Sequence, residues 1–289
     1  MSSYQDGPSS HLFNPISFQG VPRHTALSNP GLSEEMVTAA EQVPSGHCVG
    51  WGIPFEIGDL INLSEQAVSI DIQPTTARWL VFMHTSDQRA ASPNRSGIVA
   101  PMRGEGQLGE HAADYVIRYS DDTEERVPIR RRFQIGAYQR HWGENCFEAV
   151  AHQKPRPTRP PHEQPSGGWG WRQTRVDVAD STDWVNWLWA WENPHPEKEI
   201  SGLRFEPVSG VVIVSAISAG ACLTQPLRWE SRRKACLHLP EGSTFEYHVD
   251  EKGLLEGLQL DMGQVISAIP RLLYPNDSWS ESDNNQNPT

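Results

Sequence analysis

Tryptophans at every second position constrain the fold of this chain more than any other feature. Trp187, Trp189 and Trp191 lie in the stretch 184–200. In a β-strand this spacing places the three rings on one face. That face is either a core of large aromatic side chains or a platform for a flat ligand. Core packing is the expectation for the strand, because large apolar rings are mostly buried, and Trp191 is retained as a candidate ligand contact.

Several other short segments have the sequence patterns of β-strands. Residues 68–73 alternate apolar and polar side chains, which is typical of a half-buried strand. Residues 79–83 and 211–217 are continuous apolar runs, which predicts strands buried on both faces. The chain has no repeat of fixed period and no alternation of strands with helices. The sequence therefore predicts an all-β fold, an antiparallel jelly-roll-like β-sandwich with a long irregular insertion and little helix.

The organisation of the chain follows from where these strand patterns begin and end. A short helix is expected over 33–41, with Ser33 as its N-cap. Further strands are expected over 228–239 and 260–268. The predicted divisions are an irregular N-terminal arm (1–46), a β-sandwich domain (47–275) with an insertion (139–175), and a mobile tail or linker (276–289).

Composition and charge narrow the function classes. The formal charge of −12 opposes nucleic-acid binding, which needs a basic face. The basic run 130–132 reads as a solvated strand edge. No apolar stretch is long enough to span a bilayer, and no secretion signal begins the chain, so we expect no membrane partner and a cytoplasmic location. The four cysteines contain no CxxC pair, which excludes zinc-ribbon and redox motifs on spacing.

Aromatic residues concentrate in and around the insertion. Seven of the eleven tryptophans lie between residues 142 and 191. Trp169 and Trp171 fall in a glycine-rich stretch, where a ring is hard to bury. Sugar rings stack on exposed indoles because their C–H bonds meet the π face and water is displaced. The sequence therefore predicts Trp142, Trp169, Trp171 and Trp191 as carbohydrate contacts, with His141 and Glu144 beside them.

Histidines and carboxylates around the insertion carry an alternative hypothesis. A hydrolase or lyase acting on a carbohydrate-like substrate would use imidazole and carboxylate groups for acid–base work. The candidate groups are His141, Glu144, His152, His162 and Glu192. A zinc or other divalent metal site would use His141, His152 and His162, but the spacing is irregular and lacks HExxH, so no cofactor is expected.

Two stretches, 113–129 and 189–200, resemble a known kind of module. The first contains Tyr119-Ser-Asp-Asp-Thr123, a turn between two strand patterns, and the second contains Trp191-Glu-Asn-Pro-His-Pro-Glu-Lys198. They are similar to the "YxDGT…IP" hairpin and the "WxNPxPxKxI" strand end of galactose-binding-like β-sandwich modules of bacterial proteins. Asp122 stands in place of the usual turn glycine.

The resemblance implies an accessory function. Such modules accompany glycoside hydrolases and precede the catalytic domain of some PHP-type metallohydrolases, whose metal motifs this chain lacks. We therefore expect a non-catalytic module that binds a ligand or a partner. We do not expect this chain alone to be an enzyme. The expected partners are carbohydrate or a downstream catalytic domain.

Overall fold

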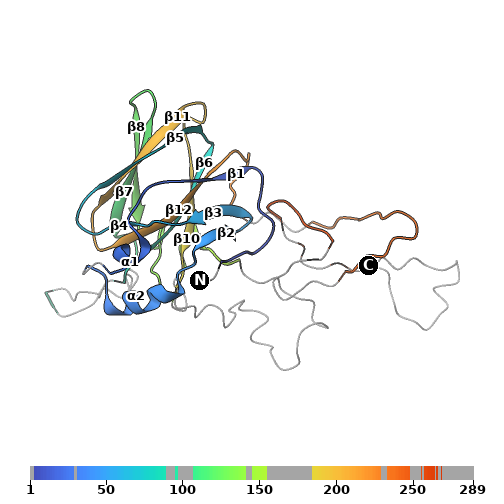
Figure 1. The fold of residues 1–289 in the computed structure, drawn as a ribbon, viewed down its shortest axis with the longest axis horizontal. Coiled ribbons are helices and arrows are strands. Elements are labelled where there is room, and N and C mark those ends of the chain that lie inside the picture. The colour runs from blue at the N-terminus through green and yellow to red at the C-terminus, as the bar shows by residue number, and fades with distance from the viewer. Residues whose placement is uncertain are drawn as a thin grey trace.

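Two antiparallel sheets pack face to face in the part of the chain that the computed structural model describes (Figure 1). The described residues are 3–28, 31–88, 95–96, 107–140, 145–154, 184–228, 233–247, 255, 257–263, 265 and 268. The strands are β1 (Phe13–Ile16), β2 (Gly46–Gly50), β3 (Ile53–Ile57), β4 (Ile61–Leu63), β5 (Val68–Thr76), β6 (Trp79–Ser86), β7 (His111–Tyr119), β8 (Glu124–Arg130), β9 (Ala149–Ala151), β10 (Trp187–Glu192), β11 (Glu199–Pro207) and β12 (Val212–Gly220). The helical elements are α1 (Arg23–Ala26), α2 (Glu34–Ala39) and the 3₁₀ turn η1 (Ala40–Gln42).

The larger sheet has the strand order β1-β12-β6-β10-β9, and β4 also pairs with β12. The smaller sheet has the order β5-β11-β7-β8, and β2 and β3 form a separate hairpin. All named strand pairs are antiparallel. The prediction of an all-β sandwich with little helix is confirmed. None of the helices in the described part is long and apolar enough to cross a membrane.

The alternating tryptophans face the core between the two sheets. Trp187, Trp189 and Trp191 are at most 8% exposed and belong to one buried cluster. Trp189 stacks on Phe82 of β6, with ring centroids 5.5 Å apart. A Cβ atom at Gly136 would lie 2.3 Å from the Trp187 indole, so only glycine leaves room for that ring. The prediction of core packing is therefore confirmed for this strand.

A second core covers the outer face of the larger sheet. The intervening residues of β10, Leu188 and Ala190, join a cluster with side chains from the β2–β3 hairpin and helix α2. This second layer explains why every residue of β6 and of β12 is buried. The continuous apolar runs at 79–83 and 211–217 are thus confirmed as strands buried on both faces.

The N-terminal residues are more ordered than the sequence predicts. Strand β1 pairs with β12 in the larger sheet, so the prediction of an irregular arm is wrong for this part. The predicted helix is present as α2, where the Ser33 hydroxyl accepts a hydrogen bond from the Met36 N–H. The Ser33 hydroxyl also donates to Asp87 at the end of β6 (2.8 Å), which ties the helix to the larger sheet.

Two other predictions are corrected. Arg131 is 3% exposed, and its guanidinium donates to the Ser86 hydroxyl (2.7 Å) and forms an ion pair with Glu110 (3.0 Å). The run 130–132 is therefore not wholly a solvated edge, because a buried guanidinium must have polar partners. In the predicted strand 228–239, the described residues 233–239 are exposed and pair with no other strand.

The two stretches that carry the resemblance contact each other. The Tyr119 hydroxyl donates to Asn193 Oδ1 (2.6 Å), and Asn193 Nδ2 donates to the Ala77 carbonyl (2.9 Å). Lys198 Nζ lies 2.8 Å from Asp121 in the β7–β8 turn. Asp122 has φ of 65°, the left-handed conformation that suits a glycine, as expected from its place in the motif. The two motifs therefore fasten the β7–β8 hairpin to the end of β10.

Replacing Asn193 with alanine is expected to lower the free energy of unfolding by about 2–3 kcal/mol. Asn193 is 3% exposed, and its loss leaves the Tyr119 hydroxyl buried without an acceptor. Urea denaturation measures the change. Adding Tyr119→Phe to Asn193→Ala removes the unpaired hydroxyl and is expected to recover part of the loss. Strictly additive losses in the double variant would contradict this account.

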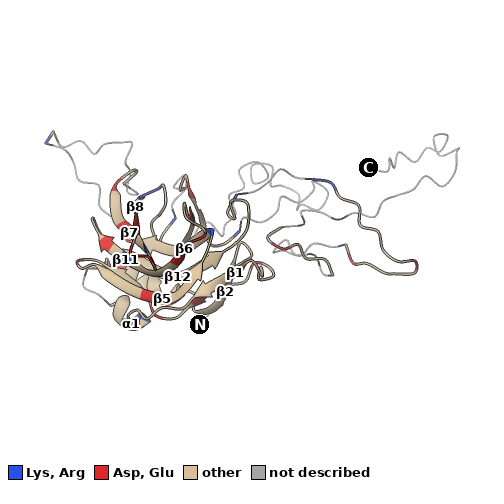
Figure 2. Cartoon of the chain, turned by 90° about the horizontal axis from the view of Figure 1, so that it is seen from above, with Lys and Arg blue, Asp and Glu red and all other residues tan. Residues whose placement is uncertain are grey.

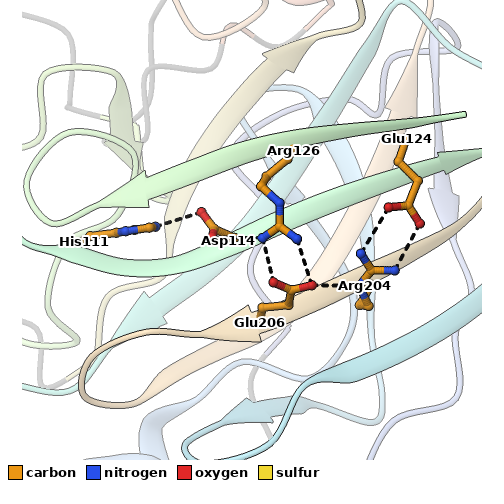
Figure 3. Close-up of polar contacts among 6 residues, drawn as sticks. All are labelled: His111, Asp114, Glu124, Arg126, Arg204 and Glu206. Carbon is orange, nitrogen blue, oxygen red and sulfur yellow. Dashed lines mark hydrogen bonds and ion pairs between the residues drawn. The ribbon is translucent and has the colours of Figure 1, made fainter.

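The outer face of the smaller sheet carries a ladder of ion pairs (Figure 3). Arg126 on β8 reaches Glu206 on β11 across β7 (2.6 Å), and Arg204 pairs with both Glu206 (2.8 Å) and Glu124 (3.0 Å). Hydrogen bonds from Arg126 and then Arg204 lower the pKa of Glu206 to about 2. Figure 2 shows acidic residues on several strands of this sheet. These ion pairs lie on the solvent-facing side of the sheet, and exposed pairs of this kind contribute little to stability.

Candidate functional site

The predicted insertion (139–175) contains strand β9, so the prediction that it is irregular is wrong for this part. Strand β9 pairs with β10, with Ala151 opposite Trp187. One residue further out, the His152 N–H donates to the Asn186 carbonyl (2.8 Å), and the Asn186 N–H donates to His152 Nδ1 (3.2 Å). This hydrogen-bonded pair, His152 with Asn186, is called the insertion base.

His152 is a neutral structural residue of the insertion base. His152 Nδ1 lies 3.2 Å from both the amide nitrogen and the carbonyl oxygen of Asn186, so the backbone of Asn186 engages this ring atom in either tautomer. Burial lowers the pKa of His152 to about 4, since a charged ring would lose its hydration. The side chain is 3% exposed and its Nδ1 is engaged, so His152 offers neither a free Nδ1 to a metal nor a proton donor to a substrate near neutral pH.

Residues near the N-terminus contact the insertion base. The buried carboxylate of Asp6 accepts hydrogen bonds from the N–H groups of Trp51 (2.7 Å) and Gly52 (3.3 Å), at the turn of the β2–β3 hairpin. Lys154 Nζ lies 3.9 Å from Asp6. Burial raises the pKa of Asp6, and the nearby Lys154 charge opposes that rise. Tyr4 packs edge-on against the His152 ring, with centroids 5.1 Å apart.

Sequence reasoning missed these bracing residues. Tyr4, Asp6 and Lys154 have no periodic pattern or motif around them. The Tyr4 hydroxyl accepts from the N–H of Lys154, 150 residues further along the chain. Only the fold brings such residues together, so no local signal could have identified them.

Most of the predicted site residues lie outside the described residues. These are His141, Trp142, Glu144, His162, Trp169 and Trp171. Trp191 lies in the core between the sheets and is 8% exposed, so its ring has no open face for a ligand. No group of three or more His, Cys, Asp or Glu side chains that could hold a metal occurs among the described residues. A metal site at His141, His152 and His162 stays a prediction, although the engaged His152 Nδ1 does not favour it.

The geometry also bears on the hydrolase alternative. Glu192 is exposed at the far end of β10, where it pairs with Arg78 (3.0 Å). His152 lies beside Asn186 at the other end. Six residues of extended strand separate the two ends by about 20 Å. Glu192 and His152 therefore cannot act on the same bond.

A second buried histidine lies inside the sandwich. The Tyr115 hydroxyl donates to His84 Nδ1 (2.7 Å), and Nε2–H donates to the Gln134 carbonyl (2.9 Å). Burial lowers the pKa of His84 to about 4 and raises that of Tyr115 well above its usual value. Both groups are fully buried between the sheets, so this pair is structural rather than catalytic.

No known protein family matches the chain, and no curated protein does either. The resemblance to galactose-binding-like modules therefore rests on the two motifs alone. In the structure these motifs form the contact between Tyr119 and Asn193 and the one between Asp121 and Lys198. These contacts hold the β7–β8 hairpin against the end of β10.

Proposed function

We propose that this protein is a non-catalytic β-sandwich module that binds carbohydrate through the segment 139–175. The observation that carries the proposal is the insertion base, where His152 and Asn186 close the ends of a long connection. Loops of this length inside a compact domain are uncommon and are usually functional. Following the resemblance, we assign the module an accessory role beside a hydrolase.

The insertion base makes a rigid support for a binding segment. Its backbone pairing continues the β9–β10 ladder, and the Trp51 indole donates to the Ala151 carbonyl (2.9 Å). The Asp6 carboxylate and the Tyr4 ring add buried contacts from the N-terminus. A site on a fixed support loses less conformational entropy when it binds, which favours affinity.

The composition of the segment supports carbohydrate as the ligand. It contains Trp142, Trp169 and Trp171 together with polar and proline residues. A tryptophan stacked on a sugar contributes about 1 kcal/mol beyond the area it buries, so two or three such contacts give weak monovalent binding. Such an affinity suits an accessory module, which acts by keeping a linked enzyme near its substrate.

A glycan array followed by calorimetry on the full chain tests the proposal. We expect binding of at least one glycan, and a loss of about fivefold to tenfold in affinity for each of Trp169→Ala and Trp171→Ala. Tyr247→Ala serves as the control, because Tyr247 is 49% exposed and lies outside the segment. The proposal is wrong if no glycan binds, or if both tryptophan variants bind as the parent protein does.

A further inference from the structure

Phe147 is the most exposed aromatic side chain among the described residues. Phe147 is 72% exposed, although it lies within the segment 139–175 and only two residues before β9. A phenylalanine left in water forgoes the stability that burying its ring would add. A large apolar side chain held open in this way often marks a contact site.

The backbone holds this ring in place. The Phe147 N–H donates to the Arg132 carbonyl (3.0 Å), and the N–H groups of Glu148 and Ala149 both donate to the Phe133 carbonyl (3.0 and 3.1 Å). The ring of Phe147 lies against that of Phe133, with centroids 5.1 Å apart and planes at 40°. Two aromatic rings from different parts of the chain are thus locked together at the surface.

Polar side chains lie at the edge of this aromatic pair. Gln134 Nε2 donates to the Glu148 carboxylate (2.9 Å), and Gln134 Oε1 accepts from the Arg130 N–H (2.9 Å). The Gln134 amide is therefore oriented by the backbone, and it in turn orients Glu148, whose side chain is exposed. The surface combines an open ring face with a carboxylate and an amide in fixed positions.

We propose that Phe147 and Phe133 form a stacking platform for a neutral sugar ring, with Glu148 and Gln134 as its hydrogen-bonding partners. One face of a pyranose carries C–H bonds that pack on an aromatic ring, and its edge carries hydroxyl groups that both donate and accept. An apolar anchor of a protein partner would instead need a pocket that excludes water, whereas Phe147 is 72% exposed. This inference rests on the proposed function and gives it a contact surface within the described residues.

Two variants of the 289-residue chain test the platform against the glycan that the array identifies and against neutral monosaccharides at high concentration. We expect Phe147→Leu to lower the affinity about fivefold, because leucine keeps apolar packing but has no π face. We expect Glu148→Gln to lower it to a lesser extent. Saturation-transfer NMR is expected to show sugar C–H protons in contact with aromatic protons. Leu223→Ala is the matched control, since Leu223 is 80% exposed and lies outside the segment.

The outcomes separate this inference from the proposed function. If Phe147→Leu binds as the parent protein does while Trp169→Ala loses binding, the platform is wrong and the proposed function stands. If no sugar binds to the parent protein, both are wrong. Melting curves of each variant show whether the fold is kept. A folded Phe147→Leu protein with weakened binding, alongside an unchanged Leu223→Ala protein, supports the platform.

Discussion

Replacing Trp189 with alanine is expected to lower the free energy of unfolding by about 3–5 kcal/mol. Trp189 is 5% exposed and stacks on Phe82, and its ring also meets Tyr115 edge-on from the opposite sheet. Truncation would leave a cavity between the two sheets. Hydrogen bonds between neighbouring strands fix the backbones around it, so the core could close over the cavity only in part. Urea denaturation followed by fluorescence and circular dichroism measures the change.

Two comparisons make this prediction specific to the core. Trp189→Phe keeps an aromatic ring in the cluster and is expected to lose less stability than Trp189→Ala. Val208→Ala, at a position 51% exposed, is expected to change stability by less than about 0.5 kcal/mol. A Trp189→Ala protein as stable as the parent would show that the ring is not part of the core.

Acidification is expected to destabilise the protein as pH falls from 6.5 to about 4. His84 and His152 each have a pKa lowered from 6.5 to about 4 in the fold, because burial disfavours the charged ring. In this window the unfolded chain binds protons that the folded chain does not, so stability is full above pH 6.5 and is lost as pH falls. The difference in pKa corresponds to about 3 kcal/mol for each histidine.

Denaturation curves at several pH values across this window measure the loss. His84→Gln and His152→Gln are each expected to be less stable than the parent at neutral pH and to show a shallower fall on acidification. His24→Gln is the control, because His24 is exposed on α1. A parent protein whose stability stays level from pH 6.5 to 4 would show that neither histidine is held neutral.

The sequence patterns with a period of two predicted the strands well. The buried runs of β6 and β12 and the tryptophan face of β10 all lie where alternation or continuous apolar character placed them. The β7–β8 hairpin follows from its aspartates, because the turn needs a residue that tolerates positive φ, as Asp122 does. These features depend on neighbours within a few residues, which a sequence shows directly.

Features that depend on distant contacts were predicted poorly. The N-terminal arm looked irregular because β1 has four residues and contains a proline, yet it completes an edge of the larger sheet. Arg131 looked solvated because charged residues surround it in sequence, yet the fold gives it buried partners at Ser86 and Glu110. Residues 233–239 have strand character in the sequence, but within the described part of the chain they pair with no strand.

For the candidate site too, some features were evident from the sequence and others only from the tertiary structure. The sequence alone determined that aromatic residues gather in and around the predicted insertion (139–175) and that Trp187 and Trp189 occupy one face of a strand. Only the tertiary structure decided that Trp191 is buried, that His152 is engaged by Asn186, and that Phe147 is held open beside Phe133. The reason is physical: the side-chain period of a strand is a local property, whereas burial and pairing are set by residues that are far apart along the chain.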